Sequence, residues 1–384
     1  MRVATDVGGT FTDLVYYEYD EETGVVGKVR TEKSDTTPPN FEEGVMNTID
    51  QANLSPGDFR FFAHGTTVVI NALTERKGAK TGLITTKGFK DILEIQRGNR
   101  PDVFNFYFSK PVPFVPRHLR LEITERTTYK GDIDTAVALD ELAGIIENFR
   151  VEGVEAAAIC FLHSYANPAN EIAVLEELNR LYPELSAVAS HQITREWREY
   201  ERTSTAVLSA YVHPNTNRYL DSLERRLEED GFSGNAFVMQ SNGGIASMAA
   251  ARRNPITMVE SGPASGVLGA VALGQLIDEP NIIALDIGGT TAKCSLIENA
   301  QVRLTTDYRI DWSRTKAGYP IKTPVVDIVE IGNGGGSIAW IDQGGKLHVG
   351  PESAGAVPGP AAYGRGGTEP TTTDAHLITR RIDE

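Results

Sequence analysis

Alternating or continuous apolar residues form two pairs of short runs that lie far apart in the chain. Within each pair, Gly-Gly-Thr separates the runs, and a strand, a glycine turn and a second strand predict a β-hairpin. The first pair covers residues 3–7 and 14–17, and the second covers residues 282–287 and 294–297. Residues 4–13 read ATDVGGTFTD and residues 284–293 read ALDIGGTTAK, which agree at five of ten positions. The sequence therefore predicts a duplicated hairpin.

Between the two hairpins, stretches whose apolar residues have the spacing of a strand alternate with stretches whose apolar residues have the spacing of a helix. We expect strands at 61–63 and 156–162, and helices at 41–52, 137–149, 170–181, 195–210 and 216–229. Residues 260–270 carry Pro263 near a helix start and continue with small residues, which favours a helix that packs closely on another backbone. The Gly and Pro break at 278–281, directly before the second hairpin, is the best hinge candidate. The alternation of strands and helices predicts an α/β fold.

Composition narrows the class of protein. Of 384 residues, 40% are hydrophobic and 23% are charged, which is typical of a folded chain of two or three domains. The formal net charge of -15 argues against a general nucleic-acid or anionic-membrane binder, because either surface repels it. Only two cysteines, no signal-peptide pattern and no apolar run of membrane length predict a cytoplasmic protein without disulfides.

Glycines at the two predicted tips indicate a site for phosphate groups. Without side chains they let the backbone approach a ligand and turn amide donors towards phosphate oxygens, and we expect positive φ angles at Gly9 and Gly289. Asp6 and Asp286 precede the turns, where a carboxylate can hold a hydrated Mg²⁺. Additional hydroxyl donors are Thr10 and Thr290. One such segment alone is equally well interpreted as an ordinary hairpin, but two copies favour the phosphate site.

Three further features carry two interpretations each. Asp327 precedes a glycine loop and is either a metal ligand or base, or a carboxylate in a turn at a strand end. His64 titrates near neutrality and either orients substrate or takes a proton, or is a structural histidine. The four aromatic side chains within residues 104–108 either form a substrate wall or pack as a satellite of the core.

The hairpins and the small-residue helix together resemble the actin, sugar kinase and heat-shock ATPase fold. In that fold two related lobes each give one phosphate hairpin, and a small-residue helix crosses between them. The resemblance implies an α/β protein with two lobes, residues 1–280 and 281–384, and ATP in the cleft between them. It places hairpin one at 6–12, the connecting helix at about 261–273 and hairpin two at 286–293.

Further motifs resemble the hydantoinase A and oxoprolinase family, which includes the ATPase subunits of acetone and acetophenone carboxylases. These motifs are HGTT at 64–67, TGLITTKGFKD at 81–91, QSNGG at 240–244, IGNGGGS at 331–337 and GPAAYGRGG at 359–367. The resemblance implies ATP-driven activation of a carbonyl or amide oxygen with Mg²⁺ or Mn²⁺, and a hydantoinase B-type partner subunit in a hetero-oligomer. We expect hydrolytic opening of a cyclic amide or imide. The open alternatives are carboxylation of a ketone through an enol phosphate, and a non-enzymatic actin-like scaffold ATPase.

The motifs and the resemblance together assign candidate site residues. The candidate nucleotide-binding residues are Gly8, Gly9, Thr10, Thr12, Gly288, Gly289, Thr290, Thr291, Lys293, Gly334, Gly335 and Gly336. The candidate metal ligands are Asp6, Asp286 and Asp327, and these three together with His64 are the candidate catalytic residues.

Two departures from the family pattern matter. Ala362 stands where many members carry cysteine, so a cysteine role in that loop is not expected. Family members run well beyond 384 residues and include, after the present end, a glycine-rich loop for the adenine and ribose. We therefore expect a fragment or a split polypeptide with an incomplete second lobe, and we expect the isolated chain to be inactive.

Overall fold

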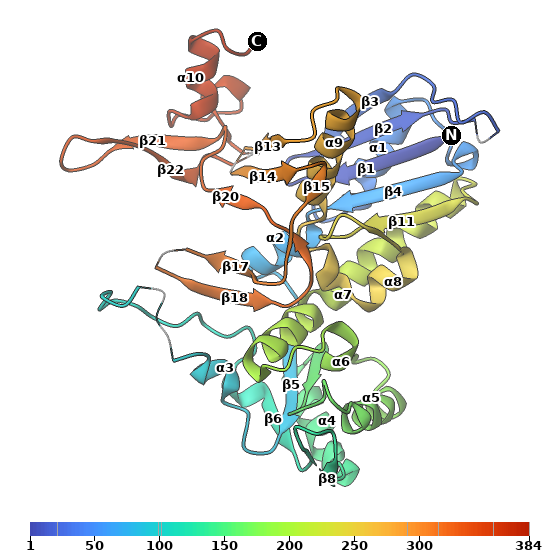
Figure 1. The fold of residues 1–384 in the computed structure, drawn as a ribbon, viewed down its shortest axis with the longest axis vertical. Coiled ribbons are helices and arrows are strands. Elements are labelled where there is room, and N and C mark those ends of the chain that lie inside the picture. Colours follow the sequence, from blue (N-terminus) through green and yellow to red (C-terminus); the bar gives the residue numbers. More distant parts are fainter. Residues whose placement is uncertain are drawn as a thin grey trace. The chain divides into compact units, whose positions relative to one another are not determined.

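The computed structural model describes residues 1–20, 22–98, 100, 102–289, 291–313, 315–355 and 357–383. These residues form a mixed α/β fold, as predicted (Figure 1). The chain divides into a first unit, Met1–Gly262 with Thr305–Val325, and a second unit, Pro263–Leu304 with Val326–Glu384. This division differs from the predicted boundary at residue 280. The small-residue helix beyond Gly262 packs with hairpin two, and residues 305–325 return to the first unit.

The first unit contains two sheets and the helices around them (Figure 1). The strands of the large sheet are β1 Arg2–Val7, β2 Phe11–Tyr17, β3 Arg30–Asp35, β4 Phe61–Thr66, β11 Asn235–Met239 and β12 Ile245–Ser247. Those of the small sheet are β5 Thr81–Thr86, β6 Arg120–Ile123, β9 Ala156–Cys160 and β10 Ser186–Ala189. The helices are α1 Phe41–Gln51, α2 Val68–Thr74, α3 Ile92–Ile95, α4 Leu142–Glu152, α5 Ala169–Leu181, α6 Ser190–Ile193, α7 Glu199–Glu229 and α8 Met248–Arg253.

Shorter elements complete the first unit. Two-stranded hairpins are formed by β7 Arg126–Thr127 with β8 Ile133–Thr135, and by β17 Tyr308–Trp312 with β18 Ala317–Ile321. Single 3₁₀ turns cover Pro56–Asp58, Arg117–Leu119, Leu139–Glu141 and Pro255–Met258.

The large sheet places hairpin one at its centre. Its strands lie in the order β12-β11-β4-β1-β2-β3, with β4 parallel to both β1 and β11 and the other pairs antiparallel. Alternation along β1 and β2 buries Val3, Val7 and Leu14. Val45 and Ile49 from α1 belong to the same core. The hairpin therefore stands on a packed sheet, with only its tip beyond the strands.

The small sheet is wholly parallel, in the order β10-β9-β5-β6. Both β5 and β9 are buried along their whole length, as expected for parallel strands covered on two faces. A Cβ on Gly82 would lie 2.4 Å from the ring of Phe149, so α4 packs directly against β5. On the other face, Thr203 of α7 donates a hydrogen bond to the sulfur of Cys160 (3.2 Å).

Helix α7 lies between the two sheets (Figure 1). The prediction of two helices at 195–210 and 216–229 is wrong, because α7 continues through Pro214. Proline inside a helix costs about 3 kcal/mol, and packing of α7 on both cores offsets that cost. The neighbouring segment contacts the helix at this point, since the amide of Ala79 donates to Tyr211 O (2.9 Å). The chain therefore enters the small sheet beside the turn of α7 that contains Tyr211. It leaves the small sheet through that same turn.

The second unit contains hairpin two and a second glycine-rich segment. Its main sheet is built from β13 Ile282–Ile287, β14 Ala292–Glu298, β15 Gln301–Val302 and β20 Val329–Ile331. Its other elements are α9 Ser261–Leu276, β21 Ser337–Ile341, β22 Leu347–Ser353, a 3₁₀ turn Ala361–Tyr363 and α10 Thr372–Ile378. The division between the units falls within a two-stranded pair, β16 Leu304–Thr305 with β19 Val325–Val326. Helix α9 packs Ala264 and Val267 on Ile297 of the sheet.

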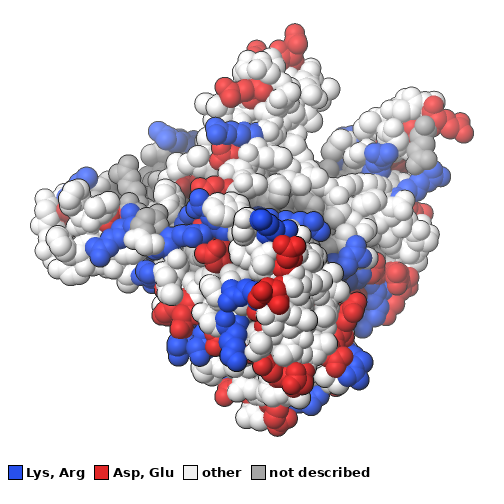
Figure 2. Space-filling view, turned by 60° about the horizontal axis from the view of Figure 1, so that its bottom comes forward, with Lys and Arg blue, Asp and Glu red and all other residues white. Residues whose placement is uncertain are grey.

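Across the described residues, no helix combines the length and the apolar character that crossing a membrane requires. On the face shown in Figure 2, Lys and Arg side chains are interspersed with Asp and Glu side chains and are not gathered by sign.

Candidate functional site

Hairpin one has the predicted geometry of a short glycine tip. Strands β1 and β2 pair with Asp6 opposite Asp13 and Val7 opposite Thr12, and the amide of Gly8 donates to Phe11 O (2.9 Å). This hydrogen bond closes the turn, so that Gly8, Gly9 and Thr10 project beyond the sheet. Asp6 is half-buried and lies at the base of the tip, where the sequence placed it.

Thr36 supports the tip of hairpin one and was not predicted. Its hydroxyl donates to Gly8 O (2.9 Å), and its amide donates to Thr10 O (2.9 Å). Thr12 is fully buried, and its hydroxyl lies 3.2 Å from that of Thr36. The expectation that Thr12 holds nucleotide is therefore corrected: its side chain faces the support of the tip, because strand alternation directs it into the sheet interior.

Two glycines enclose the Asp6 carboxylate. Gly65 lies opposite Asp6 on β4, and a Cβ there would be 2.6 Å from Asp6 Oδ1. A Cβ on Gly262 would be 3.3 Å from the same oxygen. Ser261 fixes this approach, since its hydroxyl donates to Thr66 O (2.9 Å). The motif at 64–67 and the start of α9 at Ser261 and Gly262 therefore meet beside the Asp6 carboxylate.

Hairpin two repeats hairpin one in detail. Asp286 lies opposite Lys293 and Ile287 opposite Ala292, and the amide of Gly288 donates to Thr291 O (3.0 Å). Asp286 is exposed, and Lys293 lies between Asp286 and Glu330 in the strand register. The candidate Thr290 lies outside the described residues. The two half-sites belong to different units.

The glycine loop supports hairpin two. The amides of Gly335 and Gly336 donate to Gly288 O (2.9 Å) and Gly289 O (2.6 Å), and that of Gly334 donates to the Ser337 hydroxyl (2.8 Å). These amides are thus engaged within the protein. The loop therefore supports hairpin two as Thr36 supports hairpin one, and the expectation that Gly334, Gly335 and Gly336 bind nucleotide stays a prediction.

The backbone at the tips differs from the expectation in one respect. Gly9 and Gly289 do not have positive φ angles, and a Cβ at either position would meet no atom within 4 Å. The expected left-handed conformation is therefore wrong for both glycines. Because these glycines have no side chain, the space beyond the tip is free. A phosphate group would approach through that space.

Asp327 and His64 occupy different environments. The carboxylate of Asp327 lies 3.6 Å from Arg303 Nε, and the Ser295 hydroxyl donates to its carbonyl (2.9 Å), so it is held at the start of β20. His64 is fully buried between the Thr5 hydroxyl (2.8 Å from Nδ1) and the Tyr219 hydroxyl (2.6 Å from Nε2). Burial lowers the pKa of His64 to about 3.

These surroundings decide between the two interpretations of His64. Both ring nitrogens have hydroxyl partners, and the ring has no exposed surface with which to meet a substrate. The catalytic expectation for His64 is therefore corrected to a structural role, in which it ties β4 to α7. Asp327 retains both of its interpretations.

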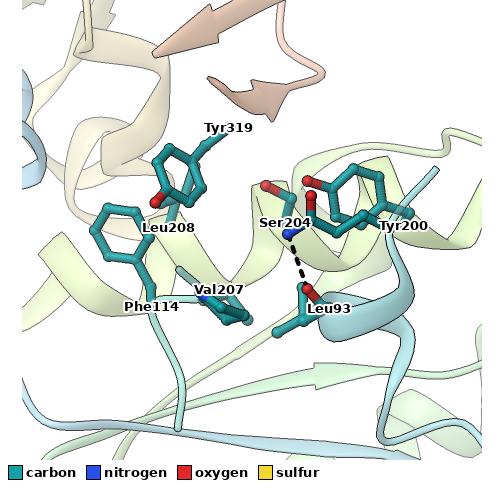
Figure 3. Close-up of a pocket in the computed structure, with 9 residues that line it drawn as sticks. Leu93, Phe114, Tyr200, Ser204, Val207, Leu208 and Tyr319 are labelled. Carbon is teal, nitrogen blue, oxygen red and sulfur yellow. Dashed lines mark hydrogen bonds between the residues drawn. The ribbon is translucent and has the colours of Figure 1, made fainter. Parts of the chain in front are cut away.

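A pocket in the first unit has none of the candidate residues in its lining (Figure 3). It has about 260 Å³ of empty space, including solvent at its mouth, and is lined by side chains such as Phe114, Val207 and Tyr319. Gln96 closes one side by donating to Leu93 O (3.2 Å). Its walls are largely apolar and its volume is below that of typical ligand pockets, so we interpret it as imperfect packing between α7 and the hairpin β17–β18.

The aromatic segment at residues 104–108 exposes most of its rings. Phe104, Phe106 and Tyr107 are almost fully exposed, which excludes the satellite-core interpretation for these three side chains in this structure. The end of the segment is fixed, since Gln96 donates to Pro111 O (3.0 Å) and Tyr319 donates to Val112 O (2.8 Å). The interpretation as a substrate wall stays a prediction.

Comparison with family models gives two matches that together account for nearly the whole chain. The model described as the hydantoinase/oxoprolinase N-terminal region matches residues 2–182. The model described as hydantoinase/oxoprolinase matches residues 202–384.

Two relatives extend this result. An uncharacterised protein of Methanocaldococcus jannaschii is 40% identical over 393 residues, which cover 100% of this chain and 57% of that protein. The caprolactamase subunit alpha of Pseudomonas jessenii is 35% identical over 98% of this chain and 54% of its own length. This chain thus spans little more than half the length of these relatives.

Solved structures of similar fold include those of two enzymes. The ATP-dependent caprolactamase of Pseudomonas jessenii has a TM-score of 0.82 at 32% identity, covering 100% of this chain and 55% of that chain. The nucleotide-free acetone carboxylase has a TM-score of 0.81 at 26% identity, with the same coverage. The mixed α/β fold is therefore shared with two enzymes that are described as ATP-dependent.

Proposed function

This chain belongs to the hydantoinase/oxoprolinase family, and we propose that it is the nucleotide-binding part of an ATP-dependent enzyme that opens a cyclic amide. The observation that carries this proposal is the repeated hairpin. Both copies have the same strand register, the same amide-to-carbonyl bond across the tip and a carboxylate at the same position. Both tips are also supported from behind, by Thr36 in one unit and by Gly335 and Gly336 in the other.

The residues of each half-site suit one end of a nucleotide phosphate chain. Gly8, Gly9, Gly288 and Gly289 allow phosphate oxygens to approach the backbone of the tips. Because Thr36 and the glycine loop bind tip carbonyls, the tips are held in place before any ligand arrives. Lys293 adds a positive charge beside hairpin two. When bound, ATP supplies the phosphoryl group that activates the carbonyl oxygen of the substrate.

The two aspartates suit Mg²⁺ or Mn²⁺. Mg²⁺ keeps several waters and takes one or two carboxylates together with phosphate oxygens. Among the residues that the structure describes, no group of three or more His, Cys, Asp or Glu side chains is arranged as a complete metal cage. One carboxylate lies at the base of each hairpin, and Asp6 is held between two glycines. This arrangement meets the requirement of Mg²⁺ better than it meets that of zinc. Asp6 and Asp286 would hold the ion, and Asp327 is a candidate for a further contact.

The choice of a cyclic amide rests on relatives. The caprolactamase is similar over nearly the whole chain at 35% identity, and a lactam is a cyclic amide. A second candidate is a subunit of an ATP-dependent ketone carboxylase, which the similarity to acetone carboxylase at 26% identity supports. Since the chain matches only about half of these proteins, activity, substrate and partner subunits are all parts of the proposal.

The experiment compares substrates in the assembled enzyme. The assembled enzyme is this chain, either extended to full length or combined with its partner polypeptides. Phosphate release from ATP is measured with a lactam, a hydantoin or oxoproline, and then with acetone or acetophenone, each with and without bicarbonate. Turnover on cyclic amides that does not need bicarbonate supports the proposal. Strict dependence on a ketone together with bicarbonate refutes it in favour of the carboxylase. Nucleotide control of filament assembly without turnover on any substrate would favour the scaffold alternative.

A further inference from the structure

A further glycine-rich tip lies at the same edge of the large sheet as hairpin one. Strands β1, β4 and β11 run parallel, and the register places Thr5, His64 and Val238 on one line across them (Figure 1). Their carboxyl ends therefore meet at one edge, where hairpin one carries its tip. Residues 240–244 form the turn between β11 and β12 at that edge, and we call this turn tip three. Ligands of open α/β sheets bind outside the carboxyl ends of such strands.

Tip three is supported from behind, as hairpin one is. Ser241 is fully buried, and its amide and its hydroxyl both donate to Thr257 O (2.7 Å each). The same hydroxyl accepts the amide of Glu260 (2.9 Å). Further along that segment, a Cβ on Gly262 would lie 3.3 Å from Asp6 Oδ1. Because two residues of chain span at most about 7 Å, the support of tip three lies close to the base of hairpin one.

The backbone of tip three does not suit a phosphate group. The amides that already donate within the protein are those of Gln240, Ser241, Gly243 and Gly244. The sequence of the tip, QSNGG, also carries no charge. Phosphate oxygens are held by several free amide donors or by a positive charge. Tip three therefore suits an uncharged ligand, in contrast to the phosphate role proposed for hairpin one.

Asn242 is the exposed side chain at the end of tip three, and its amide group has a defined orientation. Its Oδ1 accepts the amide of Gly244 (2.9 Å). Because a backbone N–H can only donate, the atom beside it is the oxygen, and Nδ2 is left for an outside partner. Within the described part of the chain, no protein group accepts a hydrogen bond from Nδ2. A neutral donor of this kind pairs well with a carbonyl oxygen.

We propose that tip three binds the carbonyl group of the substrate, and that Asn242 Nδ2 donates to the carbonyl oxygen. The inference rests on the proposed function, since it takes a carbonyl compound to be activated beside hairpin one. A carbonyl oxygen has two lone pairs, so one accepts from Asn242 and the other stays available to the phosphoryl group. Strand β4 separates tip three from hairpin one, and two strand spacings amount to about 10 Å, which leaves room for a small ring beside a phosphate group. Tip three recognises the group that cyclic amides, imides and ketones share.

The test measures carbonyl binding and nucleotide binding separately. Calorimetry follows the titration of caprolactam, and then of acetone, into the assembled enzyme loaded with Mg·ADP, and the titration of ADP into the enzyme alone. We expect Asn242→Asp to weaken binding of the carbonyl compound at least about tenfold, because it sets a negative oxygen against the carbonyl oxygen, while ADP binds as in the parent. The matched control is Asn235→Asp, since Asn235 is also exposed but lies at the opposite end of β11. This variant should bind both ligands like the parent.

Phosphate release by the same samples separates this inference from the proposed reaction. If Asn242→Asp turned over a lactam with the kcat/KM of the parent, the reaction would stand and the role of tip three would be overturned. If the parent bound a carbonyl compound without turnover and Asn242→Asp lost that binding, the reaction would fail and the role of tip three would stand.

A second variant keeps the test decisive if Asn242→Asp melts below the parent. In Gly244→Ala the new Cβ would lie 3.1 Å from Asn242 Oδ1, so it shifts the side chain of Asn242 without removing it. Carbonyl binding should weaken several-fold, because a directed donor must keep its position. A loss of ADP affinity in either variant, or a parent that binds neither caprolactam nor acetone, would overturn the proposal.

Discussion

The sharpest prediction concerns the close approach of Gly65 to Asp6. In Gly65→Ala the new Cβ would lie 2.6 Å from Asp6 Oδ1, a distance that real Cβ atoms do not show. The backbone of Gly65 accepts alanine, since its φ is not positive, and the fold should survive. The cost therefore falls on the carboxylate of Asp6, which must turn away from its place at the base of hairpin one.

The size of the effect follows from the geometry. To restore even a 3.0 Å separation the oxygen has to move by about 0.4 Å. Metal sites require ligands held within about 0.5 Å of their productive positions. Displaced supporting groups typically cost 10- to 100-fold in metal affinity or activity, which corresponds to about 1.4–2.8 kcal/mol. We expect a loss of that size in ATP turnover, with the melting temperature changed by only a few degrees.

The assay is phosphate release by the assembled enzyme over a range of Mn²⁺ concentrations, together with a thermal melt of each variant. A displaced ligand should raise the Mn²⁺ concentration needed for half-maximal rate. The control is Gly144→Ala on α4, where a Cβ meets no atom within 4 Å and the same amino-acid change is made without contact to Asp6. If Gly65→Ala turned over ATP like its parent, or if it merely unfolded, the role given to this contact would be refuted.

Three further predictions address the other half-site and the buried histidine. Asp286→Asn should lower ATP turnover roughly 100-fold or more. Its melting temperature should not change, because the side chain is exposed. Unchanged turnover would remove Asp286 from the mechanism. Gly336→Ala brings a Cβ to 3.0 Å from Gly289 O, and calorimetric titration of the assembled enzyme should show nucleotide bound roughly tenfold more weakly, with Gly269→Ala in open space as control. Because the pKa of His64 is about 3 when folded and near 6.5 when unfolded, the unfolded chain binds more protons between these values. The free energy of unfolding should therefore fall below about pH 6.5, by up to about 1.4 kcal/mol per pH unit. His64→Gln should flatten that slope in urea melts, and an equal slope in both proteins would contradict the assignment.

Local patterns were enough to predict the elements that carry the site. The strand predicted at 282–287 is β13, and the helix predicted at 41–52 is α1 within one residue at its end. Both rest on periodicity that a few neighbouring residues decide. The small-residue helix after Ser261 also appears where it was predicted. Its assignment to the second unit depends on contacts with β14, which periodicity does not report.

The supports of the site depend on contacts between distant residues and were therefore missed. Thr36 reaches Gly8 from beyond the next strand, and Gly335 reaches Gly288 from some forty-seven positions away. The register between β1 and β4 brings Gly65 to Asp6, although each motif had been recognised separately. A usable signal existed in the glycines of those motifs, because a glycine inside a strand often marks a close backbone approach. Which atom it approaches was decided only by the fold.

The meeting of Ala79 with Tyr211 has a consequence for the history and the engineering of the chain. Residues 80–210 leave the large sheet and return to it at one hydrogen bond, and between these points they build a core of their own. A segment whose ends coincide can be inserted, exchanged or removed with hardly any linker. Residues 80–210, which carry the small sheet, could thus have been inserted in a single event into an older sheet that already contained hairpin one. The same segment is the natural place to graft a different module without disturbing hairpin one.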